Sequence, residues 1–162
     1  MINFIVWMTA ILSPILVASI LEILSVTENG KQRLLKRIYL SGEYQVEFNE
    51  EIDGVPVRGF LDCLGDGFIT DSKSSRSVSK FRYDVNSWSY DIQAYIYTQV
   101  FGIKDYYWVV QEKTYPFYPA LVKCSDETLF KGEMKFNEAV GNIKQWLTEG
   151  SPTETSYAEF IV

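Results

Sequence analysis

The spacing of hydrophobic and polar residues along the chain predicts a mixture of strands and helices. Alternating apolar and polar positions are typical of half-buried strands, whereas apolar positions three and four residues apart are typical of amphipathic helices. The segments with strand-like alternation are 43–48, 55–64, 68–74, 106–113 and 117–123. The segments with helical spacing are 31–40, 84–101 and 126–147. The predicted order is therefore α-β-β-β-α-β-β-α.

Turn-forming residues separate several of these segments. Asp53-Gly54 and Asp66-Gly67 each lie between two predicted strands, and Asp-Gly favours a two-residue hairpin loop. Ser125 precedes the last predicted helix, where a serine hydroxyl can cap the first turn. These signals predict a turn near Asp53-Gly54, a central hairpin at Asp66-Gly67 and a final helix that begins near residue 126.

The first 27 residues form an apolar segment that we expect to be helical. No charged side chain occurs from Met1 to Leu21, a length that can span a bilayer. The basic region that usually starts a secretory signal is lacking. We therefore expect a core-forming segment, with a membrane anchor as the alternative. Residues 28–150 are predicted to form the folded domain and residues 151–162 a flexible tail.

Composition excludes several classes of enzyme. The 162-residue chain contains no histidine, which removes Ser-His-Asp and Cys-His triads and histidine-based metal sites. Cys63 and Cys124 are not part of a CxxC pair, so zinc ribbons and four-cysteine iron–sulfur clusters are excluded and reduced thiols are expected. The net charge of −6 argues against non-specific coating of nucleic acid. It does not exclude a nucleic-acid enzyme whose basic residues are gathered in one place.

The second predicted hairpin carries two aspartates in register. A two-residue loop pairs Gly65 with Phe68, and counting outward places Asp62 opposite Asp71. Opposed residues project to one face with Cβ atoms about 4.5–5.5 Å apart, so the two carboxylates repel unless a proton or a cation lies between them. Lys73 lies two residues beyond Asp71 and is therefore expected on the same face.

Two carboxylates beside a lysine are typical of a divalent-metal site that cleaves phosphodiesters. Hard oxygen ligands suit Mg²⁺ or Mn²⁺, and we expect Asp62, Asp71 and the Ser72 main-chain carbonyl to hold one or two ions. Lys73 is expected to be charged and to orient the attacking water or stabilise charge. The alternative is a hairpin with surface carboxylates, but Asp62 has apolar sequence neighbours, where an uncompensated charge is costly.

The helix predicted after this hairpin adds further polar side chains. Gln93 and Tyr97 are four residues apart and share a face, with Tyr90 one turn earlier. Amide and phenol groups bind phosphate or a water on a metal readily. Ordinary helix packing is the alternative for this face. Trp88 and Tyr95 are expected to pack in the core rather than to stack on bases.

Asp62, Asp71-Ser72-Lys73 and Gln93-x-x-x-Tyr97 together resemble motifs of the PD-(D/E)xK nuclease superfamily. The likeness is greatest to the RecB/lambda-exonuclease branch, especially the exonuclease VIII (RecE-like) nucleases of phages, and covers about residues 28 to 148. The resemblance implies an α/β (α+β) fold with a restriction-endonuclease-like core, in which helices flank a mixed sheet of about five strands. It also implies Mg²⁺-dependent hydrolysis of DNA, usually from a duplex end.

The resemblance carries further expectations. Family members usually add a Glu or His from a preceding helix as a metal ligand; here Glu28 has suitable spacing, with Glu43 and Glu22 as alternatives. The iron–sulfur variant of the branch is excluded by the missing cysteines. A ring-shaped homo-oligomer, a single-strand annealing recombinase as partner and a cytoplasmic location in a bacterial host are also implied. Membrane anchoring by residues 1–21 is the alternative location.

Three cations, Arg58, Arg76 and Lys80, lie near the second hairpin in the sequence. They are candidates to contact DNA phosphates, although for any single one of them a solvated surface position is the preferred interpretation. We therefore predict a metal-dependent DNA exonuclease of phage-type recombination or repair. An endonuclease of the same fold and a nuclease-like DNA-binding protein that has lost part of its site are the alternatives.

Overall fold

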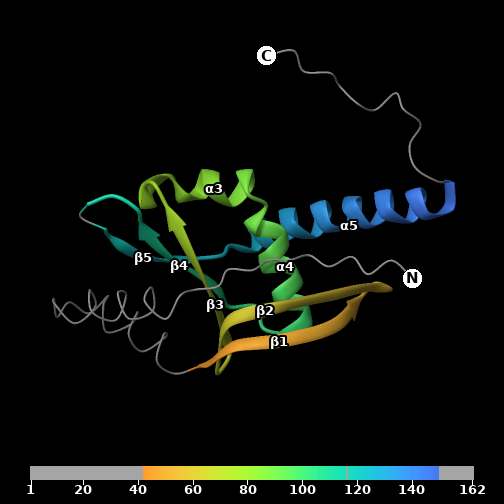
Figure 1. Ribbon diagram of the computed structural model, residues 1–162, viewed down its shortest axis with the longest axis horizontal. Helices are drawn as coiled ribbons and strands as arrows, with labels where there is room; N and C mark the ends of the chain where they lie inside the picture. Colours follow the sequence, from red (N-terminus) through yellow and green to blue (C-terminus); the bar gives the residue numbers. More distant parts are fainter. Residues whose placement is uncertain (1–41, 116, 150–162) are drawn as a thin grey trace, which may run out of the picture.

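The structure is a computed structural model that describes residues 42–115 and 117–149, which fold into a mixed sheet with packed helices (Figure 1). The elements, in chain order, are β1 (Glu43–Ile52), β2 (Val55–Gly65), β3 (Phe68–Ser75), the 3₁₀ helix η1 (Val78–Lys80), α3 (Phe81–Ser87), α4 (Tyr90–Phe101), β4 (Tyr106–Glu112), β5 (Pro119–Lys123) and α5 (Asp126–Glu149). The five strands lie in the order β1-β2-β3-β4-β5. Only the β3–β4 pair within this sheet is parallel. The predicted α+β class and the five-stranded mixed sheet are confirmed.

Several predictions fall on parts of the chain that lie outside the described residues. These are the helix at 31–40, the apolar segment 1–27, the tail 151–162, and the candidate ligands Glu22 and Glu28. From residue 42 to 149, leaving out 116, no helix combines the length and hydrophobicity needed to cross a membrane.

Both Asp-Gly dipeptides form turns, as predicted, and each turn joins two antiparallel strands. Asp53 and Gly54 have φ values of 51° and 79°, and Gly67 has a φ of 78°, the left-handed conformation that such tight loops require. In the second hairpin, Gly65 pairs with Phe68, as predicted. The ladder between β2 and β3 ends after three pairs, one position before Asp62 and Asp71 would pair. From there on β3 continues beside β4, with which it pairs as far as Ser75.

The single helix predicted for 84–101 is wrong: the chain forms two helices, α3 and α4, with a break at Trp88 and Ser89. Ser89 has a φ of 53°, a left-handed conformation that ends regular helix and redirects the chain. The break lets α3 bury Phe81 in the core while α4 turns a different face toward the sheet. Trp88, predicted to pack in the core, is therefore 68% exposed, whereas Tyr95 is buried as predicted.

Two strand boundaries differ from the predicted ranges by more than one residue. β1 continues past residue 48 to Ile52, because its pairing with β2 extends to the Ile52–Val55 pair next to the turn. β5 begins at Pro119 rather than at 117, and this edge strand pairs with β4 alone. Proline lacks an amide donor and is tolerated at the start of an edge strand, which explains the later start.

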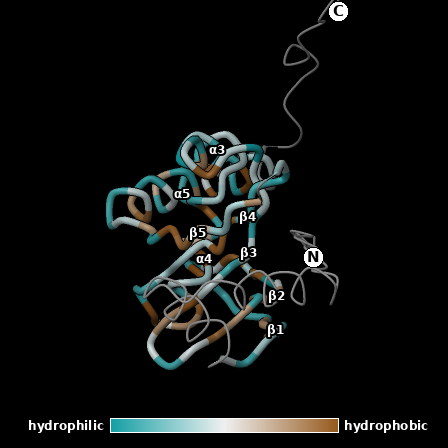
Figure 2. The backbone as a smooth tube through the Cα atoms, turned by 90° about the vertical axis from the view of Figure 1, so that its left-hand side faces the viewer, coloured by the Kyte–Doolittle hydropathy of each residue, from teal (hydrophilic) through white to brown (hydrophobic). Residues whose placement is uncertain are grey.

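The core lies where the helices meet the central strands. β4 contributes Tyr106, Trp108 and Val110, all essentially buried, and Leu61 of β2 and Phe81 of α3 pack in the same cluster. The hydropathy colouring in Figure 2 shows hydrophobic stretches on β4 and β5 in the interior. Because β4 is buried on both faces, its near-continuous apolar run fits a central strand rather than an edge strand.

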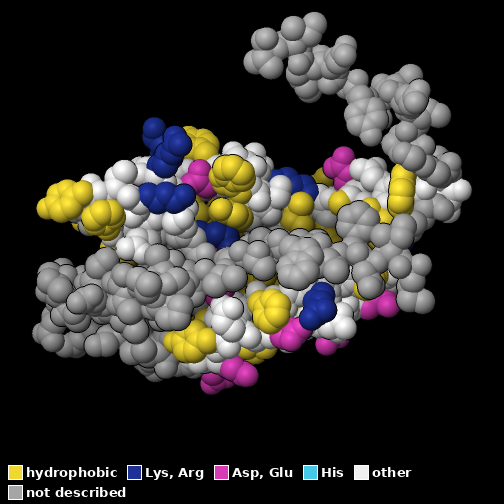
Figure 3. All heavy atoms as spheres, in the orientation of Figure 1, with side chains coloured by type: hydrophobic (Ala, Val, Ile, Leu, Met, Phe, Trp, Pro, Cys, Tyr) yellow, Lys and Arg dark blue, Asp and Glu magenta, His cyan; other side chains and the backbone are white. Residues whose placement is uncertain are grey.

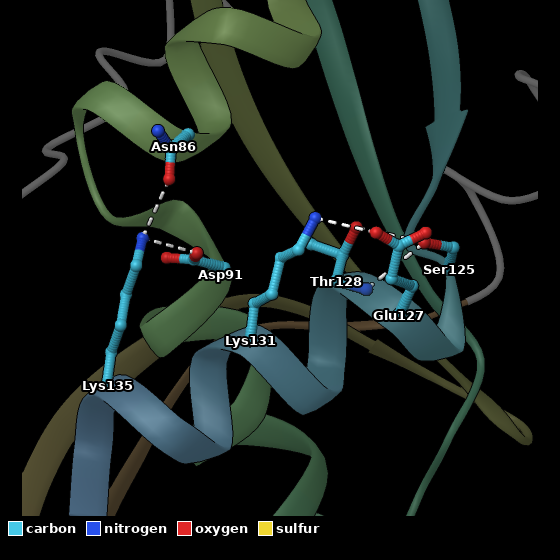
Figure 4. Close-up of polar contacts among 7 residues, drawn as sticks. All are labelled: Asn86, Asp91, Ser125, Glu127, Thr128, Lys131 and Lys135. Carbon is cyan, nitrogen blue, oxygen red and sulfur yellow. Dashed lines mark hydrogen bonds and ion pairs between the residues drawn. The ribbon is translucent and has the colours of Figure 1, made fainter. Parts of the chain in front are cut away.

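Helix α5 packs along α4 and is fixed by polar contacts at its first turns (Figure 4). The Ser125 hydroxyl accepts a hydrogen bond from the Thr128 amide at 3.2 Å, which confirms the predicted cap. Lys135 lies 2.6 Å from the buried carboxylate of Asp91 on α4. A Cβ atom on Gly132 would fall 2.1 Å from the Asp91 carbonyl oxygen, so glycine permits this close approach. α4 is thereby held between the sheet and α5.

Candidate active site

The fold brings four of the five predicted catalytic residues into contact and places the fifth, Asp62, beside them. Asp62 comes from β2, Asp71 and Lys73 come from β3, and Gln93 and Tyr97 come from α4. Hydrogen bonds and an ion pair link Asp71 to Lys73, Gln93 and, through Gln93, Tyr97. The site therefore lies where β3 leaves β2, next to α4.

Asp62 is buried at the end of the short β2–β3 ladder. Its Oδ2 atom accepts a hydrogen bond from the Ser72 amide at 2.8 Å, and its Oδ1 atom accepts one from Gln45 Nε2 at 3.3 Å. Burial, and next the negative charge of Asp71, raise the pKa of Asp62 from 3.8 to about 6. The two aspartates are thus close enough to repel, although they are not a ladder pair.

Asp71 is the most enclosed carboxylate of the site, with 2% of its surface exposed. Lys73 Nζ forms an ion pair with its Oδ2 atom, and Gln93 Nε2 donates to its Oδ1 atom at 3.0 Å. Burial raises the pKa of Asp71, while the Lys73 charge and the two hydrogen bonds act in the opposite direction. The carboxylate is therefore held in one orientation by two different side chains.

Lys73 points to the same side of β3 as Asp71, as strand alternation predicts. Its Nζ atom also lies 4.8 Å from the centre of the Tyr90 ring at the start of α4. A cation over an aromatic face is attracted to the ring. The lysine is thus placed by a carboxylate on one side and an aromatic ring on the other.

Gln93 and Tyr97 form a chain of hydrogen bonds from α4 to β2. Gln93 Nε2 donates to the Tyr97 hydroxyl at 3.1 Å as well as to Asp71, and the hydroxyl donates to the Phe60 carbonyl at 3.0 Å. Burial raises the pKa of Tyr97 above its ordinary value, so the phenol keeps the proton that it donates. Gln93 and Tyr97 lie four residues apart on one face of α4, so this face can contact both strands. Gln93 fixes Asp71 on β3, and Tyr97 fixes β2, the strand that carries Asp62.

Gln45 contacts the site but was absent from the predicted residues. The Asp53-Gly54 turn sets the β1–β2 register, in which Tyr44 pairs with Cys63 and Val46 with Leu61, so Gln45 stands across from Asp62. Counting residues outward from the Asp53-Gly54 turn would therefore have placed a polar residue, Gln45, opposite Asp62. Gln45 has a φ of 55°, which is unusual for a residue other than glycine and aims its amide at the Asp62 carboxylate.

The oxygen atoms of Asp62, Asp71 and Gln93 suit a divalent cation. The carboxylates of Asp62 and Asp71 both have raised pKa values, because burial disfavours their charged forms. A cation between them would offset the cost of burying these two negative charges. The Gln93 Oε1 atom is buried and has no hydrogen-bond partner within the described residues, so it can accept from a water on such an ion. Hard oxygen atoms of this kind are ligands for Mg²⁺ and Mn²⁺.

A third acidic ligand is not found in the described part of the chain. There, no three His, Cys, Asp or Glu side chains come together in a way that could hold one metal ion. Glu43, one of the predicted alternatives, is exposed at the start of β1 and does not join Asp62 and Asp71 in such a group. Glu28 and Glu22 remain predictions.

The three predicted DNA-contacting cations differ in their surroundings. Arg58 on β2 pairs with Glu47 of β1 at 2.6 Å, and both side chains are exposed. Arg76 and Lys80 are exposed on the connection between β3 and α3, directly after Lys73. Arg76 and Lys80 therefore come shortly after Lys73 in the chain and are exposed. The charge of Arg58, in contrast, is partly compensated by Glu47.

The family assignment follows from this fold and site. Residues 16–161 match a family model described as "PDDEXK-like domain of unknown function (DUF3799)", and the chain belongs to that family. The predicted membership of the PD-(D/E)xK superfamily is confirmed, and the domain is nuclease-like in its fold and in its arrangement of carboxylates and lysine.

Two solved structures are similar to the chain. A crystal structure described as a "putative exonuclease" from Eubacterium rectale has 20% sequence identity and a TM-score of 0.65, over 83% of this chain and 54% of that one. The structure named SSO0001 has 16% identity and a TM-score of 0.40, over 74% of this chain and 57% of that one. The chain thus spans little more than half of the length of these structures. No curated protein matches its sequence.

Proposed function

We propose that this protein is a Mg²⁺- or Mn²⁺-dependent deoxyribonuclease, and more specifically an exonuclease that hydrolyses duplex DNA from an end. The observation that carries the proposal is the ion pair and hydrogen bond that join Asp71 to Lys73 and Gln93, with the buried carboxylate of Asp62 close enough for the Asp71 charge to raise its pKa, in the PDDEXK-like fold. The description of the similar structure from Eubacterium rectale adds support for exonuclease rather than endonuclease activity. The resemblance to RecE-like nucleases supports a role in phage-type recombination.

Each residue has a distinct part in the proposed reaction. Asp62, oriented by the Ser72 amide, and Asp71, oriented by Gln93, would hold the ion together with the Ser72 carbonyl. When bound, a divalent ion acidifies water and offsets the phosphate charge. Lys73, fixed by Asp71 and Tyr90, can direct the attacking water toward phosphorus or stabilise the charge that develops there. Tyr97 holds Gln93 and β2 in place.

Exposed cations supply the proposed DNA contacts. Arg76 and Lys80 are best placed, because they are exposed in the segment that follows Lys73 in the chain, while Arg58 already pairs with Glu47. Each phosphate contact adds to a salt-dependent affinity. A ring-shaped assembly, a recombinase partner and a cytoplasmic site of action are proposed on the family resemblance alone.

The test is digestion of linear and closed-circular duplex DNA with MgCl₂ and with EDTA. We expect the full chain to degrade linear DNA only with the metal and to leave covalently closed circles intact. Lys73→Ala and Asp71→Asn should each lower the rate by at least about a hundredfold, because each removes a group that contacts the reacting atoms or the ion.

Lys104→Ala is the matched control, since Lys104 lies in the connection between α4 and β4, away from the carboxylate cluster. Its rate should match that of the wild type, and melting curves should show that all three variants are folded. Cleavage that persists in EDTA, or full activity of Lys73→Ala, would contradict the mechanism. Nicking of closed circles would instead identify an endonuclease.

A DNA-binding protein that has lost catalysis is the second candidate. The observation in its favour is that only two acidic side chains meet within the described part of the site. It predicts metal-independent binding of duplex DNA with no cleavage of any substrate. The digestion experiment, combined with a gel-shift assay on the same DNA, separates the two candidates.

A further inference from the structure

The loop between β4 and β5 presents a group of aromatic side chains to solvent. Tyr115 is 87% exposed, Tyr118 is 62% exposed, and Phe117 is also exposed. The Tyr115 and Phe117 rings contact each other edge to face, with centroids 6.3 Å apart. Figure 3 shows hydrophobic side chains at the left-hand end of the molecule, where Figure 1 places this loop. Large aromatic rings at a loop tip lose contact with water when a ligand covers them, so the group is suited to binding.

The backbone of the loop holds these rings outward. Phe117 has a φ of 58°, a left-handed conformation that is rare for an aromatic residue. Its amide donates to the Thr114 carbonyl at 2.7 Å, and the Glu112 amide donates to the Tyr118 carbonyl at 3.1 Å. The exposed rings are therefore attached to a closed, hydrogen-bonded loop rather than to a free end.

Cations surround the aromatic group, although the whole chain is acidic. Lys113 is exposed in the loop itself, and Arg76, Lys80 and Arg82 are exposed in the connection after β3 and at the start of α3. Hydrogen bonds from the Val78 amide to Glu112 and from the Lys113 amide to Ser75 join that connection to the end of β4. Residues 75–84 and 112–118 carry only two acidic side chains, Glu112 and Asp84, against these four cations. Figure 3 shows Lys and Arg side chains next to the hydrophobic ones at this end. The local charge is thus positive and complementary to a polyanion.

This surface is continuous with the candidate active site. β3 and β4 are parallel neighbours, and the Lys113 amide donates to the Ser75 carbonyl at 2.9 Å. Ser75 lies two residues after Lys73, which corresponds to about 7 Å along a strand. A DNA strand whose phosphate reaches Lys73 can therefore extend over the loop within a few nucleotides.

We propose that the β4–β5 loop and the cations around it bind an unpaired strand of DNA, with bases stacked on Tyr115 and Tyr118 and phosphates facing Arg76, Arg82 and Lys113. The occupant is single-stranded because duplex DNA hides its base faces, whereas exposed aromatic rings bind unpaired bases of any sequence by stacking. The inference rests on the proposed function, because it assigns the surface to the same DNA that the nuclease site would cut.

The test measures equilibrium binding in EDTA, where metal-dependent cleavage does not occur. A fluorescein-labelled 15-nucleotide oligothymidine and a blunt duplex of equal length serve as probes, with fluorescence anisotropy as the readout. The double variant Tyr115→Ala/Tyr118→Ala should bind the single strand at least about tenfold more weakly, since each stacked base contributes substantially to affinity. Its affinity for the duplex should change less than about threefold. Tyr115→Trp/Tyr118→Trp should restore single-strand binding.

Phe130→Ala is the matched control, because Phe130 is an exposed aromatic on α5, near the opposite end of β5 from the loop. It should leave binding of both probes unchanged. Arg82→Gln should lower the dependence of log affinity on log salt concentration by roughly one phosphate contact, about 0.7, while the tyrosine variants leave that slope unchanged. Melting curves should confirm that each variant is folded, as expected for exposed positions.

Several outcomes would overturn the inference. These are undetectable binding of the single strand by the full chain, equal losses on single strand and duplex, or no loss in the tyrosine variant. Size-exclusion chromatography that shows a dimer dissolved by the tyrosine substitutions would assign the surface to self-association instead. Failure of the nuclease proposal is distinguishable, because it would appear as absent cleavage with aromatic-dependent binding intact.

Discussion

At the scale of single residues, the site is built by giving each buried polar group a specific partner. Asp71 has Lys73 and Gln93, and Asp62 has the Ser72 amide and Gln45. A buried carboxylate without such partners is costly, so the partners decide which orientation persists. Gln45 is the least expected of them, because it adopts a left-handed φ of 55° within a strand.

Substitution of Gln45 should separate metal binding from stability. In Gln45→Gly the carboxamide is lost, but glycine accepts the left-handed conformation without strain. We expect the affinity for Mg²⁺ to fall by about tenfold, in the range usual for groups that orient metal ligands. The free energy of unfolding should stay the same or rise by up to about 1 kcal/mol. Terbium luminescence with Mg²⁺ competition and urea melts measure the two quantities.

Asn49→Gly is the control for this substitution, because Asn49 is an exposed amide on the same strand, opposite Arg58 rather than Asp62. It should leave Mg²⁺ affinity unchanged. A large loss of stability in Gln45→Gly with unaltered metal affinity would show that Gln45 has a purely structural role.

At the scale of elements, the position of α4 determines whether Gln93 and Tyr97 reach the sheet. α4 is held from outside by α5 through the ion pair between Lys135 and Asp91. Asp91 is 2% exposed, whereas the Lys131–Glu127 pair one turn away on α5 is exposed on both sides (Figure 4). The two pairs have similar geometry but different burial, which makes them a matched comparison.

Lys135→Met should destabilise the protein far more than Lys131→Met. The first substitution leaves the Asp91 carboxylate buried without its cation, and we expect a loss of about 2 kcal/mol after allowing for the partial exposure of Lys135. The second removes an exposed i,i+4 pair that contributes roughly 0.3–0.5 kcal/mol. Urea denaturation followed by circular dichroism measures both. Similar losses in the two variants would show that Asp91 does not depend on Lys135.

At the scale of the whole molecule, the buried carboxylates couple folding to pH. The pKa of Asp62 is about 6 in the folded protein and 3.8 as a free group, so the folded state retains a proton that the unfolded state releases. The contribution of Asp62 to stability without metal should therefore be fully present below about pH 4 and should be lost as the pH rises through about 6. The stabilisation by a cation bound between the carboxylates would instead increase as the pH rises, because protons compete with the cation for the same oxygen atoms.

Asp62→Asn should remove much of this pH dependence. In EDTA at pH 7.5 we expect the variant to melt at a higher temperature than the wild type, with an increase in stability of up to about 3 kcal/mol at roughly 1.36 kcal/mol per pKa unit. Added Mg²⁺ should stabilise the wild type and not the variant. Melting temperatures between pH 4.5 and 8 provide the measurement, with the exposed turn variant Asp66→Asn as control. Parallel curves for wild type and Asp62→Asn would contradict the assignment.

Local rules predicted most of the elements and much of the site. The two Asp-Gly turns fixed both hairpin registers, and alternation placed Lys73 with Asp71. The same rules missed the break at Ser89, because the helical pattern continues through residues 84–101, whereas the break lets α3 and α4 each bury their own side chains. The exposure of Trp88 is a consequence of that break.

The sequence by itself determined the identity and spacing of Asp62, Asp71, Lys73, Gln93 and Tyr97, because turns, strand alternation and helical spacing act over a few residues. The tertiary structure alone decided that α4 lies over β3, that β3 leaves β2 before the aspartates pair, and that Gln45 supports Asp62. It also decided which cations and aromatic rings share one surface beside Lys73. These arrangements depend on contacts between distant segments, whose free energies come from burial and hydrogen bonding that no short sequence pattern records.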